Sequence, residues 1–310
     1  MKEILDRAGQ DMVCANGDLH LILDAIPTPL SWATLPDGRI RFINRAFKKT
    51  FGYEDGTFAT VEDWIDHGYA HEDDRCRARL RWRELWNSVG RGTTEIEPIE
   101  LPVLCADGTV LTVQHRGIVL HEAGVAIATF EDISALKLAK DALRRIAFED
   151  SLTGLPNRRA LQTRWSEAIA RKPAALALLI IDLDHFKPVN DAYGHETGDM
   201  ALSLVGRRLE ACAAPEFLCR LGGDEFAILI ESDSAHAQAE RICAAIAAAF
   251  AGPFMIGGTE AAIGASVGVS LYPEHGTGLG ELLRHADEAL YRLKRAGRSG
   301  HEWYAAPARA

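Results

Sequence analysis

An eight-residue aliphatic run, Ala174 to Ile181, constrains the fold of this 310-residue chain more than any other feature. A membrane-spanning helix needs about 20 apolar residues, so the run is too short to cross a bilayer. Its length and aliphatic character are typical of a buried strand. The run leads into Asp182-Leu183-Asp184, and carboxylates at a strand end are well placed to hold a hard cation such as Mg²⁺. A solvated turn would show the same pattern.

Helix and strand patterns alternate on both sides of this run, over residues 150–310. Helices are expected over 157–170, 197–212, 235–250 and 279–296, and strands over 176–182, 217–221, 226–230 and 262–271. This order predicts an α/β domain with antiparallel pairing in its middle. Residues 18–134 are expected to be strand-rich with short helices, because turn pairs at Asp37-Gly38 and Asp107-Gly108 separate apolar segments.

Residues 135–149 carry the pattern of a helix that joins the two domains. Its apolar positions are spaced by three, four and three residues, which makes a short heptad stripe: Leu136, Ala139, Leu143 and Ile146. A stripe of this length cannot hold a dimer alone but could extend one held by the flanking domains. We therefore expect an arm or short helix at 1–17, a domain at 18–134, a coupling helix at 135–149 and a second domain at 150–310.

Composition and charge exclude several classes of protein. The chain is 47% hydrophobic and 25% charged, as in ordinary soluble proteins, and its net charge of −10 argues against a broad nucleic-acid or anionic-membrane surface. The six cysteines form no Cys-x-x-Cys pair, which favours free thiols in a reducing cytosol over a zinc site. The N-terminus lacks the apolar stretch of a signal peptide. These observations predict a cytoplasmic protein that binds neither membrane nor nucleic acid.

The segment Gly222-Gly223-Asp224-Glu225-Phe226 carries the clearest sign of chemistry. Two glycines allow a tight turn and let a ligand approach the main chain. Asp224 and Glu225 beside that turn could supply a metal ligand and a base, although a plain hairpin with exposed acids would look similar.

Two further clusters could recognise a nucleotide. Asn190 and Asp199 offer donors and acceptors that could read a purine edge, and Lys187 and His195 lie near them in the sequence. Helix capping and turn formation would use the same residue types. Lys294 and Arg298 are spaced by four residues on the last helix, so they share a face and could neutralise phosphates, or form an ordinary solvated basic face.

Taken together and in order, these clusters resemble the GGDEF-domain diguanylate cyclases. The resemblance runs from Asp150 to about Tyr304, begins with Asp150-Ser151-Leu152-Thr153-Gly154-Leu155-Pro156-Asn157-Arg158, and includes Arg220-Leu221-Gly222-Gly223-Asp224-Glu225-Phe226. It implies the condensation of two GTP molecules into cyclic di-GMP and two pyrophosphates. It also implies Mg²⁺ or Mn²⁺ as cofactor, with two ions per GTP, and a homodimer, because each domain binds one GTP.

The resemblance also assigns roles to the residues that match. Metal would be bound by Asp182, the Leu183 carbonyl, Asp224 and Glu225, and catalysis would use Asp224, Glu225 and Lys187. GTP would be bound by Asn190, His195, Asp199, Gly222, Gly223, Lys294 and Arg298. Whether Glu225 is a metal ligand or a base stays open. The alternative function is a catalytically weak GGDEF module that acts as a dimerising or GTP-binding protein.

One position departs from the family pattern. Many members carry Arg-x-x-Asp as a product-binding inhibitory site five residues before the Gly-Gly pair. Here that window is Ala213-Ala214-Pro215-Glu216, so the guanidinium that would grip the product is missing. Inactive receptors of the family lose the signature and keep the inhibitory site. This chain does the reverse, which favours an enzyme without product inhibition at this site.

Residues 18–134 resemble a PAS domain, which implies a five-stranded antiparallel sheet flanked by helices. The matching segments are Ile26-Pro27-Thr28-Pro29, Asp37-Gly38-Arg39-Ile40, Asn44-Arg45-Ala46-Phe47, Phe51-Gly52-Tyr53, His71-Glu72-Asp73-Asp74-Arg75 and Asp132-Ile133-Ser134. PAS domains sense ligands, light or redox state, or only dimerise, so the signal and ligand stay unknown. Histidines 67, 71, 115 and 121 could bind haem in principle, but we interpret them as surface or loop residues.

Overall fold

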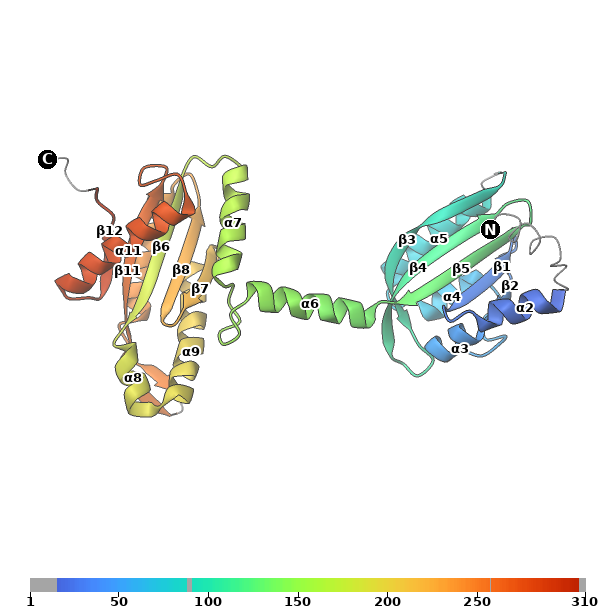
Figure 1. The fold of residues 1–310 in the computed structure, drawn as a ribbon, viewed down its shortest axis with the longest axis horizontal. Coiled ribbons are helices and arrows are strands. Elements are labelled where there is room, and N and C mark those ends of the chain that lie inside the picture. Colours follow the sequence, from blue (N-terminus) through green and yellow to red (C-terminus); the bar gives the residue numbers. More distant parts are fainter. Residues whose placement is uncertain (1–15, 88–90, 257, 307–310) are drawn as a thin grey trace, which may run out of the picture. The chain divides into compact units, whose positions relative to one another are not determined.

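The computed structural model describes residues 16–87, 91–256 and 258–306. The chain divides into two compact units between Lys140 and Asp141 (Figure 1). Nearly all of the arm expected at 1–17 lies outside the described residues. Among the described helices, none is long and apolar enough to cross a membrane.

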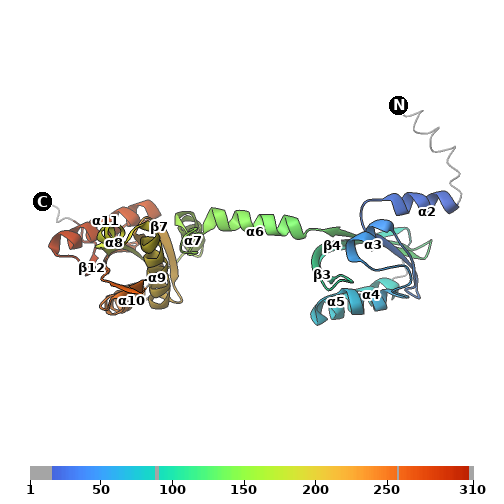
Figure 2. The same ribbon diagram turned by 90° about the horizontal axis from the view of Figure 1, so that it is seen from below.

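The N-terminal unit is built on an antiparallel sheet of five strands in the order β2-β1-β5-β4-β3. The strands are β1 (Leu30–Thr34), β2 (Ile40–Ile43), β3 (Thr93–Leu104), β4 (Val110–Leu120) and β5 (Val125–Asp132). The helices are α2 (Asn16–Ala25), α3 (Arg45–Phe51), α4 (Val61–Gly68) and α5 (Glu72–Asn87). Figure 2 shows α4 and α5 beside the curved sheet. The five-stranded architecture expected for residues 18–134 is confirmed.

Aromatic rings pack against one another in the core of this unit. Phe47 and Phe51 of α3 contact Trp64 of α4 and Phe130 of β5 with ring centroids 5.2 to 5.7 Å apart. His115 stacks on Phe130 at 4.9 Å and is only 5% exposed, so its interpretation as a surface or loop residue is wrong. Burial lowers the pKa of His115 to about 4, because the charged imidazole would lose its hydration.

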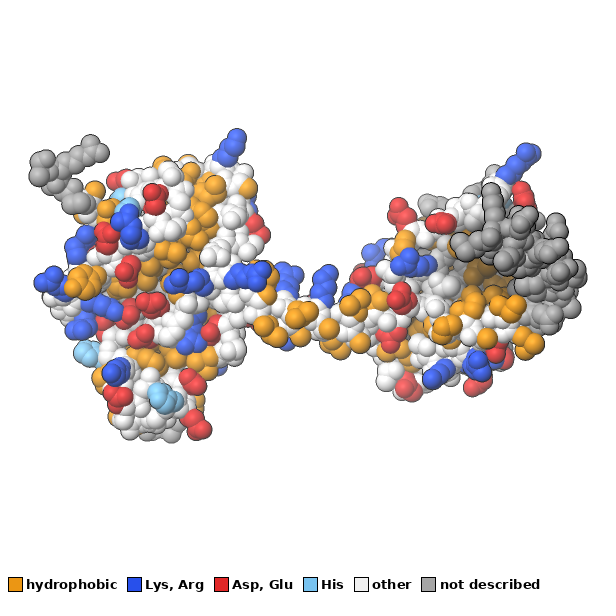
Figure 3. Space-filling model, viewed as in Figure 1, with side chains coloured by type: hydrophobic (Ala, Val, Ile, Leu, Met, Phe, Trp, Pro, Cys, Tyr) orange, Lys and Arg blue, Asp and Glu red, His pale blue; other side chains and the backbone are white. Residues whose placement is uncertain are grey.

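The helix expected over 135–149 is present as α6 (Ser134–Phe148), and none of its residues is buried. Along its apolar stripe Leu136, Leu143 and Ile146 are 68%, 67% and 78% exposed. Figure 3 shows apolar and basic side chains along this helix. An amphipathic helix with so much exposed apolar surface has a face that suits a partner.

The C-terminal unit has a five-stranded mixed sheet in the order β12-β11-β6-β8-β7, in which β12 runs parallel to β11 and the other pairs are antiparallel. Its strands are β6 (Leu176–Asp184), β7 (Phe217–Gly222), β8 (Glu225–Glu231), β11 (Gly264–Tyr272) and β12 (Gly300–Trp303), and a separate hairpin has β9 (Phe254–Ile256) and β10 (Thr259–Ala261). The helices are α7 (Arg158–Ala170), α8 (Phe186–Tyr193), α9 (His195–Ala213), α10 (Ala235–Ala249) and α11 (Leu279–Ala296).

The aliphatic run forms the central strand β6, and its alternation decides which helices cover each face of the sheet. Leu179, Ile181 and Leu183 belong to the core shared with α8, α9 and α10. Leu178 and Ile180 point the other way, toward α7 and α11. Gly268 of β11 lets α11 lie directly on the sheet, since a Cβ there would collide with the backbone of that helix. The sheet therefore carries two layers of helices.

Four short elements were missed by the sequence patterns. Helix α8 lies in a segment for which no helix was expected, and it buries only Phe186 and Val189. Strands β9, β10 and β12 have three or four residues each, too few for an alternation to stand out.

Candidate active site

The carboxylates at the end of β6 lie on the face of the sheet that α11 covers. Strand β6 continues to Asp184, two residues beyond the expected end, so Asp182 belongs to the strand and not to a turn. Asp182 pairs directly with Glu225 of β8, and alternation directs both side chains toward the same face. The Leu183 amide donates to the Asp224 carbonyl at 3.3 Å, so the two acidic segments are joined through their backbones.

Helix α11 brings a cation to these acids. The Lys294 ammonium lies 2.6 Å from Asp182 Oδ1. Asp182, Glu225, Lys294 and Asp287 line one hollow of about 410 Å³. Figure 3 shows acidic and basic side chains next to one another over this part of the unit. The hollow is open and charged, as a site for a polyphosphate and its cations would be.

Two carboxyl groups in this cluster hold their protons more tightly than usual. Burial raises the pKa of Asp182, and the charges of Asp224 and Asp184 raise it further, against the opposing effect of Lys294. Burial also raises the pKa of Glu225, and the charges of Asp182 and Asp287 add to that increase. Shifts with these causes are typical of sites where acids are gathered to bind a cation or to move a proton.

The Gly222-Gly223 turn has the backbone shape that its sequence suggested. Gly222 has a φ of 139° and Gly223 a φ of 54°, both in the region that favours glycine. No atom lies within 4 Å of the position that a Cβ would occupy on either residue. The turn is thus open above its backbone, where a ligand could approach.

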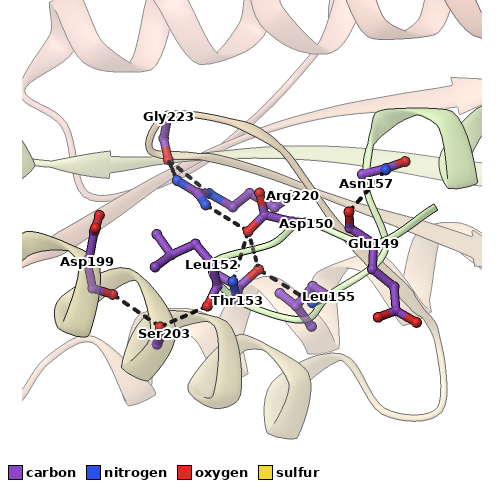
Figure 4. A network of polar contacts seen from close by, with 10 residues as sticks. All are labelled: Glu149, Asp150, Leu152, Thr153, Leu155, Asn157, Asp199, Ser203, Arg220 and Gly223. Atoms are coloured by element: carbon purple, nitrogen blue, oxygen red, sulfur yellow. Dashed lines mark hydrogen bonds and ion pairs between the residues drawn. The ribbon is translucent and has the colours of Figure 1, made fainter. Parts of the chain in front are cut away.

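Arg220 holds this turn in place, a role that the sequence patterns did not reveal (Figure 4). Its Nε and one terminal nitrogen donate to the Gly223 carbonyl at 3.0 and 2.6 Å, and its other terminal nitrogen lies 2.7 Å from Asp150 Oδ1. Asp150 also accepts from the Thr153 hydroxyl at 2.7 Å. Burial would raise the pKa of Asp150, but the hydrogen bonds from Arg220 and Thr153 lower it. The leader segment after α6 is therefore tied to the glycine turn.

The residues expected to read a base lie at a second place, where α8 meets α9. The Asn190 side chain sits against Gly198, and a Cβ on that glycine would overlap the Asn190 amide oxygen. Asp199 follows on α9 and lines a hollow of about 390 Å³ together with Leu152, Ser203 and Met255. Arg207 also lines this hollow, which therefore combines apolar side chains with one acid and one base.

The side chains of the remaining predicted residues make few contacts with other described residues. Lys187 and His195 are exposed and make no hydrogen bond or ion pair with another described residue. Arg298 is half-exposed, with its Nε 3.8 Å from Asp184 Oδ1. The structure thus groups Asp182, Asp224, Glu225 and Lys294 together. Asp199 lines a second hollow, Asn190 packs against the neighbouring Gly198, and the side chains of Lys187 and His195 stay free to move toward a ligand.

The acidic cluster fits a magnesium ion that is completed by substrate. Among the described residues, no three His, Cys, Asp or Glu side chains converge closely enough to hold a metal by themselves. Mg²⁺ is usually bound through one or two carboxylates with waters and substrate phosphates, not by an all-protein cage. Asp182, Asp224 and the Leu183 carbonyl are hard oxygen groups that would suit such an ion. The Lys294 ammonium now beside Asp182 marks the place as attractive to a cation.

Comparison with known proteins agrees with this geometry. Residues 147–300 match the sequence family described as "Diguanylate cyclase, GGDEF domain", and residues 18–87 match the PAS domain family. The solved structure of the coiled coil and GGDEF domain of DgcB from Caulobacter crescentus, in complex with c-di-GMP, is 30% identical, with a TM-score of 0.50 over 55% of this chain and 93% of that one. The chain belongs to the GGDEF family. It is a PAS–GGDEF protein, as its sequence suggested.

Relatives of this PAS–GGDEF protein carry different activities in their names. The diguanylate cyclase DgcP of Pseudomonas aeruginosa is 39% identical over 176 residues, which is 54% of this chain and 26% of that protein. The cyclic di-GMP phosphodiesterase PdeR of Escherichia coli is 40% identical over 174 residues, which is 56% of this chain and 26% of that protein. The chain spans about a quarter of the length of such relatives.

Proposed function

We propose that this protein is a diguanylate cyclase, which condenses two GTP molecules into cyclic di-GMP and two pyrophosphates. One observation carries the proposal: Asp182 and Glu225 face each other across β6 and β8, beside Asp224 and an open Gly-Gly turn, with Lys294 at 2.6 Å from Asp182. Transfer of a nucleotidyl group needs carboxylates that bind the metal ion, a cation that neutralises phosphate charge, and a backbone that a phosphate can approach closely.

The chemistry divides among these groups as follows. The 3′-hydroxyl oxygen of one GTP forms a bond to the α-phosphorus of the other, the bond from that phosphorus to the β-phosphate oxygen breaks, and pyrophosphate leaves. Glu225 accepts the hydroxyl proton or helps to hold a divalent cation. Burial and the neighbouring acids raise the pKa of Glu225, which favours its taking up a proton. Lys294 and Arg298 neutralise phosphate charge. Divalent cations held by Asp182, Asp224 and the Leu183 carbonyl would stabilise negative charge on the reacting oxygens.

The choice of base rests on Asn190 and Asp199. A carboxylate can accept from both N1–H and N2–H of guanine, whereas adenine offers no matching pair of donors. Gly198 allows Asn190 to lie against α9 beside this acid, because any larger residue would displace it. We therefore propose GTP and not ATP as the substrate.

A complete active site needs two copies of the chain. Each domain offers one set of the residues above, so two GTP molecules react only when two domains face each other, and their positioning is the main entropic cost. The exposed stripe of α6, with Ile146 at 78% exposure, suits pairing with a second copy. We propose that the PAS domain sets this pairing and thereby regulates synthesis in a cytoplasmic signalling pathway.

Turnover of GTP by two acid variants tests the function. Asp224→Asn keeps the shape of the side chain and removes its charge, and we expect activity to fall by about 100-fold or more, because a neutral amide binds a divalent cation much more weakly than a carboxylate does. Glu167→Gln, in helix α7 and 57% exposed, is the matched control and should be unaffected. Equal activity in the Asp224 variant and the parent would contradict the proposal.

A further inference from the structure

Asp184 is a buried carboxylate next to the proposed phosphate site, and its surroundings are built to hold it. It is only 2% exposed. The Ser266 hydroxyl lies 2.9 Å from both of its oxygens, and the Ser299 amide donates to Oδ2 at 3.2 Å. A buried charge is kept only where donors and a counter-charge compensate it. The two donors are neutral, so the negative charge of Asp184 still needs a cation to compensate it.

The segment that supplies the Ser299 amide has an unusual backbone. Arg298 and Ser299 have φ of 65° and 56°, both in the left-handed region that side chains other than glycine rarely adopt. Such a conformation persists where surrounding contacts determine it. Here the Ser299 amide is shared between Asp184 and the Ser266 hydroxyl at 3.2 Å, and strand β12 starts directly afterwards by pairing Gly300 with Ser266. Asp184 is therefore one anchor of this turn.

The turn carries Arg298, which is the cation that faces Asp184. Nε of Arg298 lies 3.8 Å from Asp184 Oδ1, and the side chain is 50% exposed. The terminal nitrogens of this guanidinium make no hydrogen bond with another described residue. An arginine held through Nε keeps its terminal nitrogens for a planar, two-point contact with a phosphate.

We infer that Asp184 is a positioning residue, which fixes the turn at Arg298 and Ser299 and directs the guanidinium of Arg298 toward the phosphates of GTP. The inference rests on the proposed function, because it takes the role of Arg298 from there. Its physical basis is preorganisation: a side chain already held in its binding geometry loses less freedom when the ligand arrives. Asp184 thus contributes to nucleotide affinity without touching the nucleotide.

The first experiment replaces the charge and keeps the shape. Asp184→Asn retains an oxygen that can accept from Ser266 and Ser299 but no longer attracts Arg298. We expect the Kd for a GTP analogue with a methylene bridge between the α- and β-phosphates, measured by calorimetry with Mg²⁺, to rise about fivefold to tenfold. KM for GTP should rise in parallel, with kcat within about twofold of the parent. A fall in kcat and melting temperature without a change in Kd would show a merely structural role and overturn the inference.

A matched pair of serines on β11 provides the control. Ser266 donates to Asp184, whereas Ser270, equally buried on the same strand, donates to the Leu282 carbonyl at 2.9 Å. Ser266→Ala should weaken binding of the analogue by about twofold to threefold, and Ser270→Ala should leave its Kd unchanged although both lose a buried hydrogen bond. Equal effects of the two variants would contradict a specific role of the Asp184 contact.

A double-mutant cycle then tests whether Asp184 acts through Arg298. Arg298→Ala alone should raise Kd, and adding Asp184→Asn should raise it no further. Additive effects would overturn the inference and leave the proposed function intact. If Arg298→Ala raised Kd and Asp184→Asn did not, the inference alone would fail. If Arg298→Ala left Kd unchanged, the phosphate role of Arg298 in the proposed function would fail as well.

Discussion

At the scale of single residues, the site depends on where strand alternation directs each acid. Side chains two residues apart on a strand point to the same face of the sheet, so Asp182 and Glu225 point toward α11 together with the apolar residues of that face. Leu183, between the two aspartates, is buried on the opposite face. The spacing Asp-Leu-Asp indicated carboxylates at a strand end, and a solvated turn was the alternative; the pairing of Asp182 with Glu225 appears only in the sheet register. The contacts of Arg220 with Asp150 and of Ser266 with Asp184 join segments far apart in the sequence, which no local pattern connects.

The first prediction concerns the base that Asp199 reads. Asp199→Ser removes the carboxylate that would accept from guanine N1–H and N2–H, so we expect the preference for GTP over ATP to fall by at least about tenfold, the effect of one lost charged pair of hydrogen bonds. The ratio of kcat/KM for the two nucleotides measures it. Unchanged discrimination would refute the role of Asp199.

The second prediction concerns pH. The charge of Asp287 contributes to the raised pKa of Glu225, after burial and Asp182. Glu225 must be ionised to act as ligand or base, so activity is lost as pH falls through its pKa. Asp287→Asn lowers that pKa and should move the acid limb of kcat/KM to lower pH, by about half a unit or less. Asp287→Glu keeps the charge and should not move it. A shift toward higher pH in the Asn variant would contradict this assignment.

At the scale of elements, the bounds of helix α6 are close to those predicted from the sequence. Its role as a coupling helix stays a proposal. Its bounds and exposed stripe agree with the heptad pattern, because a helix of this length repeats that pattern often enough to be recognised. Helix α8 was missed, since its eight residues bury only two side chains. Contacts with α9, and the burial of Phe186 and Val189 in the shared core, stabilise α8.

The third prediction uses the geometry of α6. Each inserted residue rotates the following chain by about 100°, so insertions of one, two or three residues after Lys140 should change GTP turnover in a phase-dependent way. An insertion of seven residues returns the stripe to nearly the same face and should restore activity. A smooth decline with insertion length would show that α6 is only a spacer.

At the scale of the whole molecule, the chain has a PAS domain and a GGDEF domain. The GGDEF domain carries Ala213 where many family members have the arginine of the product-binding site. Ala213 is 1% exposed, and Glu216 accepts from Gln238 at 3.2 Å, so neither side chain can grip a guanine base or a phosphate. Control by the PAS domain stays part of the proposal. The cytoplasmic location stays a prediction.

The fourth prediction concerns product inhibition and follows from the segment Ala213-Ala214-Pro215-Glu216. Cyclic di-GMP added at the concentration of GTP should leave the initial rate unchanged, because the site offers no guanidinium for it. Glu216→Ala should behave like the parent. Tight cyclic di-GMP binding that this substitution abolishes would show that the window still binds product.

The most direct test of the central claim is the identity and amount of the product formed from GTP. Purified protein with GTP and Mg²⁺ should yield one cyclic di-GMP for every two pyrophosphates, detected by mass spectrometry and a phosphate assay, and Asp224→Asn should yield neither. Pyrophosphate without cyclic di-GMP, or cyclic di-GMP at equal rates from parent and variant, would contradict the account.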